Sequence, residues 1–285
     1  MGLQLRSATA DDAEVCGKIC WQAFTAISKA HNFPPDIPAP EMAIGLLRMI
    51  FSHPGFYGVV AELDGRIVGS NVMDQRDAIR GVGPITVDPS AQNRSVGRRL
   101  MEAVMTRAEE DKAPGVRLIQ AAFHSRSLSL YTKLGFEVRE PLACMQGSAL
   151  GLTFPGYVVR PAALADIDAC SRICREVHGH DRAGELRDAI GQGTATVVEH
   201  DGRITGYASV MGFFGHSVGE SNHELKALIG AASGFAGPGF LLPARNADLF
   251  RWCLEKGLRV VQPMTLMSVG LYNEPAAGFI PSIFY

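Results

Sequence analysis

Residues 85–100 read ITVDPSAQNRSVGRRL, and this stretch decides how the first half of the chain is interpreted. Apolar and β-branched residues lead to Pro89, a polar turn follows, and Val96, Leu100 and Val104 recur at helical spacing. The pattern predicts a strand, a tight loop and a helix from residue 96 to about residue 110. The first N–H groups of a helix lack intrahelical acceptors and lie at the positive end of its dipole, so such a loop favours an anion.

The composition of this loop suits a diphosphate. Ser95 and Gly97 are small enough to let the backbone approach a ligand closely, while Arg94, Arg98 and Arg99 supply positive charge. A Walker A loop requires Lys and then Ser or Thr directly after its last Gly. Because Arg98 and Arg99 stand there instead, the sequence disfavours a nucleotide triphosphatase.

Two segments resemble the GNAT superfamily of acyl-CoA-dependent N-acyltransferases. The family's loop reads Gln or Arg, two residues, Gly, one residue, then Gly or Ala; Gln92 and Gly97 fit its ends, and Ser95 replaces the middle Gly. Residues 130–136, LYTKLGF, match a later helix of the family position for position. His124 stands there in place of the usual Asn, and Ser127 in place of the usual Ala.

The resemblance implies a role for each matched residue. The strand at residues 85–87 would pair with the pantetheine arm of acetyl-CoA, and N–H groups from Asn93 to Arg98 would hold the diphosphate. Tyr131 is the candidate general acid for the departing thiolate, because a phenol with a pKa near 10 stays protonated at neutral pH. The cofactor-binding residues expected on this basis are Ile85, Thr86, Val87, Gln92, Asn93, Arg94, Ser95, Val96, Gly97, Arg98, His124 and Ser127.

The chain also contains an internal repeat. Residues 5–12 reappear as residues 159–166, and cysteine pairs recur with the same offset of 154, at Cys16 and Cys20 and again at Cys170 and Cys174. Asp-Gly hairpin signals at residues 64–65 and 201–202 recur as well. A fixed offset over such a length indicates two copies of one unit.

We therefore predict an α/β (α+β) fold of two tandem GNAT-like domains, each with a mixed, mainly antiparallel sheet flanked by helices. Residues 1–150 would be the catalytic domain and residues 151–285 a degenerate copy. The second copy lacks a Gln-to-Gly loop between Gly212 and Gly237, and Cys253 stands opposite Tyr131. It is either a packing partner or a wall of the acceptor pocket. The Pro-rich segment 31–40 is either a cover for the substrate or a surface ornament.

Composition narrows the class of protein. The chain has 285 residues, of which 47% are hydrophobic and 20% are charged, and its net charge is −2, which argues against nucleic-acid or membrane binding. The polar start, the lack of a long apolar run and the spacing of the six cysteines favour a cytoplasmic protein without a disulfide framework. The cysteine pairs read as small buried residues, and we expect no metal site.

The leading hypothesis is an N-acetyltransferase in which a primary amine of a small molecule attacks acetyl-CoA directly in a ternary complex. A non-catalytic acyl-CoA sensor is the alternative, and a peptide or histone acetyltransferase is less supported. Asp74, Asp77, His124 and the carboxylate of Tyr285 are candidates for the general base. The sequence leaves open which amine is the acceptor and whether two copies form a homodimer.

Overall fold

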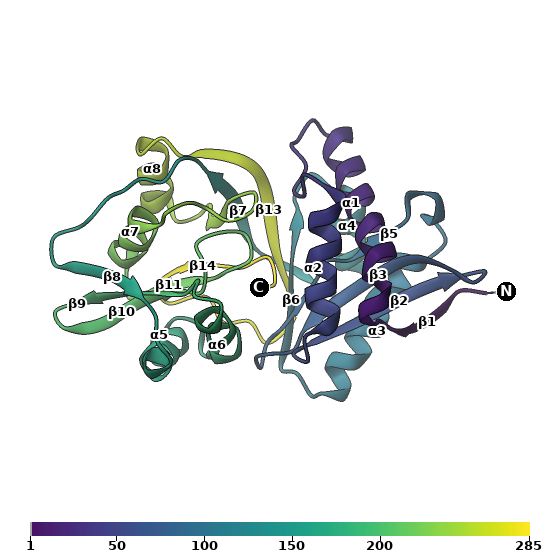
Figure 1. Ribbon diagram of the computed structural model, residues 1–285, viewed down its shortest axis with the longest axis horizontal. Helices are drawn as coiled ribbons and strands as arrows, with labels where there is room; N and C mark the ends of the chain where they lie inside the picture. Colours follow the sequence, from purple (N-terminus) through teal and green to yellow (C-terminus); the bar gives the residue numbers. More distant parts are fainter. Residues whose placement is uncertain (1) are drawn as a thin grey trace.

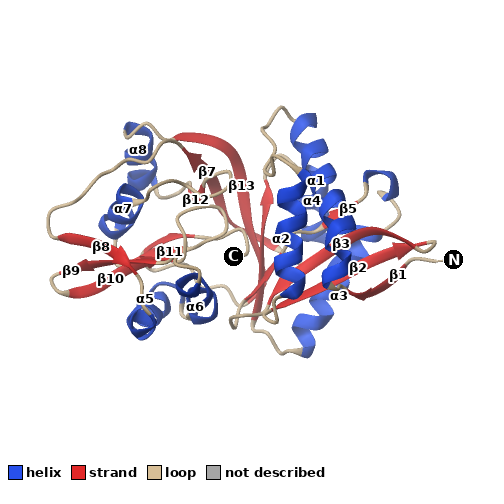
Figure 2. Cartoon of the chain, viewed as in Figure 1, coloured by secondary structure: helices blue, strands red, loops and turns tan. Residues whose placement is uncertain are grey.

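The structure is a computed structural model that describes residues 2–285 (Figure 1). Its two halves lie side by side, and Figure 2 shows helices packed against the strands of both. The first half contains β1 (Gln4–Ser7), η1 (Ala10–Asp12), α1 (Ala13–Ala30), α2 (Pro40–Ser52), β2 (Phe56–Leu63), β3 (Arg66–Asp74), β4 (Arg80–Val82), β5 (Thr86–Val87), η2 (Pro89–Ala91), α3 (Val96–Glu110), β6 (Gly115–Ala121), α4 (Ser125–Lys133) and β7 (Glu137–Gln146). The second contains β8 (Tyr157–Pro161), η3 (Leu164–Asp166), α5 (Ile167–His178), α6 (Ala183–Gly191), β9 (Thr196–His200), β10 (Arg203–Ala208), β11 (Ser217–Gly219), α7 (Asn222–Ala231), β12 (Phe240–Pro243), α8 (Ala247–Glu255), β13 (Arg259–Gly270) and β14 (Gly278–Ile280).

The duplication expected from the sequence is visible in the order of elements and in a repeated ion pair. Arg6 donates to the Asp12 carboxylate at 2.8 Å, and Arg160 donates to Asp166 at 2.7 Å, each pair joining the first strand of its half to the start of the following helix. In both halves the acidic residue also accepts a backbone N–H three positions earlier. The two copies therefore use the same contacts to turn from strand to helix.

The strands form two sheets, and two strands of the second copy belong to the sheet of the first. The nine-stranded sheet has the order β1-β2-β3-β4-β6-β13-β7-β12, with β5 paired to β3, and the second sheet has the order β14-β11-β10-β9-β8. β13 and β12 belong to the second half in sequence, yet β13 lies between β6 and β7, and β12 pairs with β7. The predicted division near residue 150 falls in the connection from β7 to β8, while the large sheet contains strands from both sides of it.

Helices cover both faces of the nine-stranded sheet. On β2, Val60 packs with residues of α1 and α2 such as Cys16 and Leu47, whereas the neighbouring Val59 packs with Leu100 of α3 on the other face. This alternation follows from the two-residue period of a strand. All six cysteines are free and buried, which confirms their interpretation as small core residues.

The edge between β5 and β6 is where the sheet opens. β4 pairs in parallel with β6 at Arg80 and Gly81, but β5, which follows it, pairs with β3 and not with β6. The outer edge of β5 therefore has no strand partner within residues 2–285. Among the helices of that same range, none is both long and apolar enough to cross a membrane.

Candidate active site

The loop between β5 and α3 leaves the start of α3 open. Asn93 and Ser95 have φ values of 65° and 61°, in the left-handed region that Asn tolerates better than most residues. Ser95 occupies the N-cap position but makes no side-chain cap hydrogen bond, and the first turn contains no acidic residue. The free N–H groups and Arg98 at this end therefore make a site with a positive potential.

Packing within the protein does not explain why residue 97 is a glycine. A Cβ added at this residue would meet only the side chains of Leu130 and Val87, at 3.7 and 3.8 Å, which is ordinary contact. The helix itself would accept Ala better than Gly. Contacts within the protein therefore leave room for a larger residue at this position.

Arg126 on α4 holds the loop in place, a role that the sequence analysis missed. Its guanidinium donates to the side-chain oxygens of Gln92 at 3.0 Å and Asn93 at 2.9 Å. Arg126 thereby ties the loop before α3 to the first turn of α4. The only signal in the sequence was a cation directly after the Ser that opens α4, which is too common a pattern to point to a function.

A cleft of about 870 Å³ joins these elements. It is lined by the open edge of β5, the loop before α3, the end of β6 and the exposed side of α4. The structure places all but one of the predicted cofactor-binding residues in the wall of this cleft: Ile85, Thr86, Val87, Gln92, Asn93, Ser95, Val96, Gly97, Arg98, His124 and Ser127. Arg94 is exposed and does not line it, so contact between Arg94 and a cofactor stays a prediction.

Tyr131 also lines the cleft, from α4. Its side chain is only 7% exposed, and burial raises the pKa of the phenol well above its ordinary value. A hydroxyl in this environment stays protonated at every physiological pH and can donate a hydrogen bond or a proton. Nearby, the Ser127 hydroxyl lies 3.0 Å from the Gln120 side-chain oxygen, and burial together with Arg126 lowers the pKa of His124.

Two of the carboxylates considered as general bases are engaged elsewhere. Asp74 is paired with Arg76 at 2.6 Å, and Asp77 accepts the backbone N–H groups of Gly184 at 2.7 Å and Glu185 at 3.1 Å. Neither residue lines the cleft. Neither candidate is therefore placed to act as a base in this cleft: Asp77 binds the first turn of α6, and Asp74 pairs with Arg76, which in turn contacts Asp188 of α6.

The C-terminal residue Tyr285 is also outside the cleft wall. Its ring lies between the guanidinium groups of Arg117, at 3.8 Å, and Arg182, at 4.5 Å, and its hydroxyl is 3.1 Å from Nε2 of His180. These contacts fix the end of the chain between the two halves. Tyr285 is 4% exposed, and only its neighbours Ile283 and Phe284 reach the cleft.

Comparison with known proteins agrees with this geometry. The family model for the acetyltransferase (GNAT) domain matches residues 54–138, which span β2 to the start of β7. The first half of the chain contains a GNAT acetyltransferase domain. No curated protein matches the sequence significantly, so the remaining likeness is one of fold.

Solved structures show that the whole chain has the tandem GNAT fold. A candidate acetyltransferase from Pyrococcus horikoshii is 18% identical and covers 95% of this chain and 90% of its own, with a TM-score of 0.74. A GCN5-related N-acetyltransferase from Sphaerobacter thermophilus is 16% identical, with coverages of 95% and 96% and a TM-score of 0.61. A tandem GNAT protein from the clavulanic acid biosynthesis pathway is 14% identical, with coverages of 94% and 98% and a TM-score of 0.56. The predicted fold class, two GNAT-like units with mainly antiparallel sheets, is confirmed.

The second GNAT unit contributes directly to the cleft of the first. Phe213, Phe214, Met264, Ile283 and Phe284 all lie in its wall, opposite residues of α1 and α2. The Pro-rich segment 31–40 reaches the same wall through Asp36 and Ile37. For the second unit, this geometry favours a role as a wall of the pocket over a role as a packing partner alone. For residues 31–40, it favours a cover for the substrate over a surface loop without a role.

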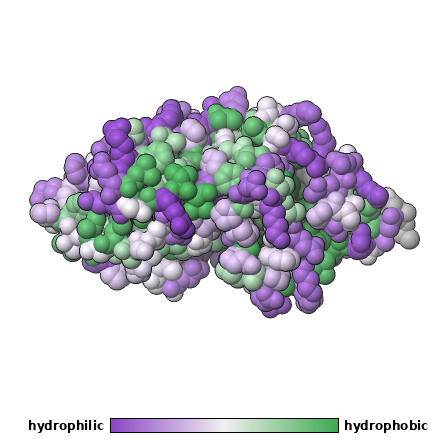
Figure 3. All heavy atoms as spheres, turned by 90° about the horizontal axis from the view of Figure 1, so that it is seen from above, coloured by the Kyte–Doolittle hydropathy of each residue, from purple (hydrophilic) through white to green (hydrophobic). Residues whose placement is uncertain are grey.

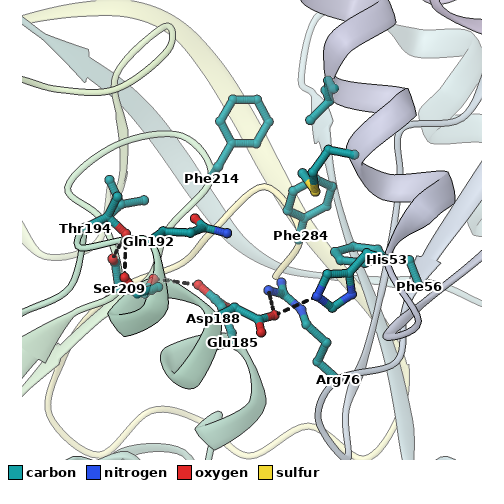
Figure 4. A pocket seen from close by; sticks show the side chains of 14 residues that line it. His53, Phe56, Arg76, Glu185, Asp188, Gln192, Thr194, Ser209, Phe214 and Phe284 are labelled. Carbon is teal, nitrogen blue, oxygen red and sulfur yellow. Dashed lines mark hydrogen bonds and ion pairs between the residues drawn. The ribbon is translucent and has the colours of Figure 1, made fainter. Parts of the chain in front are cut away.

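A smaller pocket of about 250 Å³ lies between the two units (Figure 4). Its charged groups are already paired: Arg76 and His53 contact Asp188 at 3.0 and 3.3 Å, and Glu185 accepts from the Ser209 hydroxyl at 2.6 Å. Phe214 and Phe284 line both this pocket and the large cleft. The paired charges identify the small pocket as part of the contact between the units. Within residues 2–285, no group of three or more His, Cys, Asp or Glu residues is arranged to hold a metal ion.

Proposed function

We propose that this protein transfers an acetyl group from acetyl-CoA to a primary amine of a small molecule, by direct attack of the amine in a ternary complex. The observation that carries the proposal is the meeting of three features in one cleft: the open edge of β5, the uncapped start of α3 and the buried phenol of Tyr131. Each suits a different part of acetyl-CoA. The family match over residues 54–138 supports the same activity.

Different residues of the cleft would bind the cofactor, orient the reactants and supply a proton. Backbone groups of residues 85–87 would pair with the pantetheine amides, and N–H groups from Asn93 to Arg98 would bind the diphosphate. Holding both reactants in one cleft supplies most of the rate gain through orientation. When the nitrogen of the neutral amine bonds to the thioester carbon and the C–S bond breaks, the Tyr131 hydroxyl would give its proton to the departing thiolate. The amide nitrogen would lose its extra proton to water, and the Tyr131 phenolate would take a proton back from water.

We assign catalysis to residues 1–150 and treat residues 151–285 as a degenerate copy that shapes the acceptor pocket. The wall residues Phe213, Phe214 and Met264 support this division of roles. We further propose that the reaction takes place in the cytoplasm, because six free, buried cysteines fit a reducing compartment. Pairing of two copies as a homodimer stays a prediction.

Two measurements on the full chain test the function. Isothermal titration calorimetry with acetyl-CoA measures binding, and a thiol-release assay with a panel of small primary amines measures turnover. We expect one acetyl-CoA site per chain and thiol release that depends on an amine. Absence of binding at millimolar acetyl-CoA would overturn the proposal. Binding without thiol release for any amine would support an acyl-CoA sensor instead.

A further inference from the structure

Charge is distributed unevenly along the large cleft. The basic side chains in its wall are Arg98, Arg126 and Lys133, which come from α3 and α4 at the end proposed for the diphosphate. Among the described residues that line the cleft, Asp36 is the single carboxylate. It comes from the Pro-rich segment between α1 and α2. The cleft thus has several positive charges toward one end and one negative charge on a different wall.

The structure holds Asp36 in position from two sides. Phe33, three residues earlier, stacks on Phe123 with the ring centroids 4.2 Å apart, so the segment is anchored beside the first turn of α4. On β13, Gln262 donates from Nε2 to Oδ1 of Asp36 at 2.5 Å. Gln262 is only 1% exposed, and its other side-chain atom, Oε1, has no hydrogen-bond partner among residues 2–285. The buried amide of Gln262 thus holds the Asp36 carboxylate in one orientation.

Asp36 is left without a counter-ion. Oδ2 has no hydrogen-bond partner within the described range, and no cation forms an ion pair with either oxygen. Burial raises the pKa of the carboxyl, and the hydrogen bond from Gln262 opposes this rise only in part. A carboxylate in such surroundings is stabilised by any cation that enters the cleft, because desolvation makes the ion pair stronger than it would be in water.

The walls of the cleft beyond the cofactor loop are apolar. Side chains of both units contribute to them, and the apolar members from outside the cofactor loop include Phe24, Ile37, Phe213, Phe214, Met264 and Phe284. In the space-filling view of Figure 3, the largest hydrophobic patch of the face shown lies left of its middle, with hydrophilic residues around it. Aromatic walls of this kind favour a flat or branched apolar group, which removes large areas from water.

We propose that Asp36 binds the ammonium group of the acceptor, and that the acceptor is a monoamine with an apolar body that packs against the aromatic wall. The bound ammonium loses one proton to water before its nitrogen attacks the thioester. The inference rests on the proposed acetyl transfer and adds the substrate class. A polyamine would leave its further charges against Phe and Met side chains without a partner. An acidic amino acid would bring its carboxylates to Asp36, where the repulsion has no cation to offset it.

The test compares acceptors and one variant. The acceptors are 2-phenylethylamine and hexylamine as apolar monoamines, and spermidine and glutamate as polar ones. The variant Asp36→Asn keeps the shape of the side chain and can still accept from Gln262, but it removes the charge. Asp168→Asn, an exposed position on α5, is the matched control. Initial rates give kcat and KM for each acceptor, and calorimetry gives the Kd for acetyl-CoA.

We expect the wild type to use the apolar monoamines at least tenfold better than spermidine or glutamate, as judged by kcat/KM. Asp36→Asn should lower kcat/KM for 2-phenylethylamine by about 10- to 100-fold, mainly through KM, because a charge-assisted hydrogen bond is lost. The Kd for acetyl-CoA should not change, and Asp168→Asn should match the wild type. A general structural defect would instead weaken cofactor binding and lower kcat for all acceptors.

Each contrary result has a distinct meaning. If the wild type binds acetyl-CoA and acetylates spermidine or glutamate in preference to the monoamines, the assignment of the substrate class is wrong while the acetyltransferase stands. The same conclusion follows if Asp36→Asn leaves KM for 2-phenylethylamine unchanged. Should Asp36→Asn fail to fold, the wild-type acceptor ranking still decides the question. Failure of the wild type to bind acetyl-CoA would instead remove the proposed function itself.

Discussion

The helices α3 and α7 occupy equivalent places in the two copies, yet only α3 starts in a form that can bind an anion. Eight residues, 88–95, separate β5 from α3, whereas only Glu220 and Ser221 separate β11 from α7. At α7, Ser221 caps the helix, and the Glu224 carboxylate accepts from the Ser221 N–H at 2.8 Å and from its hydroxyl at 2.7 Å. In the second copy, the protein's own carboxylate thus occupies the place where a diphosphate would bind.

The strand edges of the two copies also differ, and again only the first copy is open to a ligand. In the first copy, the outer edge of β5 is open, whereas in the second copy β14 pairs with the outer edge of β11 at Ser217, Val218 and Gly219. β14 also contacts β12, so the C-terminal segment fills the space between the two strands. A pantetheine arm has no free strand edge to pair with there.

The third difference lies on α4 of the first copy and its counterpart α8 in the second. Tyr131 of α4 lines the cleft, while its counterpart Cys253 on α8 is fully buried in the core, where burial raises the pKa of the thiol to about 12. The two copies therefore share a scaffold but not a site. The duplicated fold is kept by sheet pairing and core packing, and the proposed function depends on three local positions that can change without loss of the fold.

The largest effect should come from replacing the phenol that distinguishes the copies. Tyr131→Phe removes the proposed proton donor and keeps the ring that packs in the core, so kcat should fall by about 10²- to 10⁴-fold. The Kd for acetyl-CoA should stay close to that of the wild type. Stopped-flow thiol release and calorimetry measure the two quantities. Tyr57→Phe, on β2 and outside the cleft, is the matched control; an unchanged kcat in Tyr131→Phe would end the assignment of Tyr131 as general acid.

The copies should also differ in their response to acid, because buried neutral histidines gather in the second. Burial, followed by Arg117, lowers the pKa of His180 to about 4, and burial also lowers the pKa values of His178 and His216. The unfolded chain takes up protons as the pH falls through about 6.5, while the folded histidines stay neutral. Stability should therefore be lost between pH 7 and pH 5, by about 1 kcal/mol for His180 once its partial exposure is allowed for.

Urea unfolding at pH 7 and pH 5 checks this prediction. Trp21 lies in the first half and Trp252 in the second, so Trp21→Phe and Trp252→Phe variants let fluorescence report each half separately. The unfolding midpoint should fall at pH 5, most clearly in the Trp252 signal. His180→Gln should reduce the fall, since it removes one titrating group. An equal pH dependence with and without His180 would contradict the expected cause.

A smaller effect should follow when a carboxylate is placed at the start of α3. Arg98 and Glu224 both stand three positions after a Ser that precedes the helix, so Arg98→Glu gives α3 the acidic residue that α7 has. Affinity for acetyl-CoA should fall by about tenfold, because negative charge at the N-terminus competes with the diphosphate. Arg187→Glu, exposed on α6, makes the same change of charge outside the cleft wall and should leave the Kd unchanged. Equal Kd values for Arg98→Glu and the wild type would show that the diphosphate binds elsewhere.

Local patterns predicted much of this architecture. The helix expected from residue 96 to about residue 110 is α3 (Val96–Glu110), and residues 130–133 of the segment that resembles a later helix of the family lie in α4 (Ser125–Lys133). The repeat offset of 154 relates the Arg6–Asp12 pair to the Arg160–Asp166 pair. These features depend on residues close together in the chain, so spacing and end signals carry the information.

The same local patterns could not predict which strands pair when they are far apart in the sequence. The sequence of residues 259–270 does not say that β13 enters the sheet of the other copy, because every strand offers the same backbone groups to any neighbour. Asp74 and Asp77 were considered as bases near the reaction, yet Asp77 binds α6 directly and Asp74 pairs with Arg76, which contacts α6. Asp36 and Gln262 are 226 positions apart, and they meet only because β13 enters the sheet of the first copy.

The smallest expected effect tests why the second copy is closed. Glu224→Ala removes the capping carboxylate of α7 and should lower the free energy of unfolding by about 1 kcal/mol, as loss of a helix cap does. It should not create a second acetyl-CoA site, because β14 still covers the edge of β11 and Cys253 remains in the core. Calorimetry should give one site per chain for Glu224→Ala and for the control Glu224→Gln, which can keep the cap. A second site in Glu224→Ala would mean that the Glu224 carboxylate alone prevents acetyl-CoA from binding to this copy. It would also mean that a ligand can displace β14 from the edge of β11.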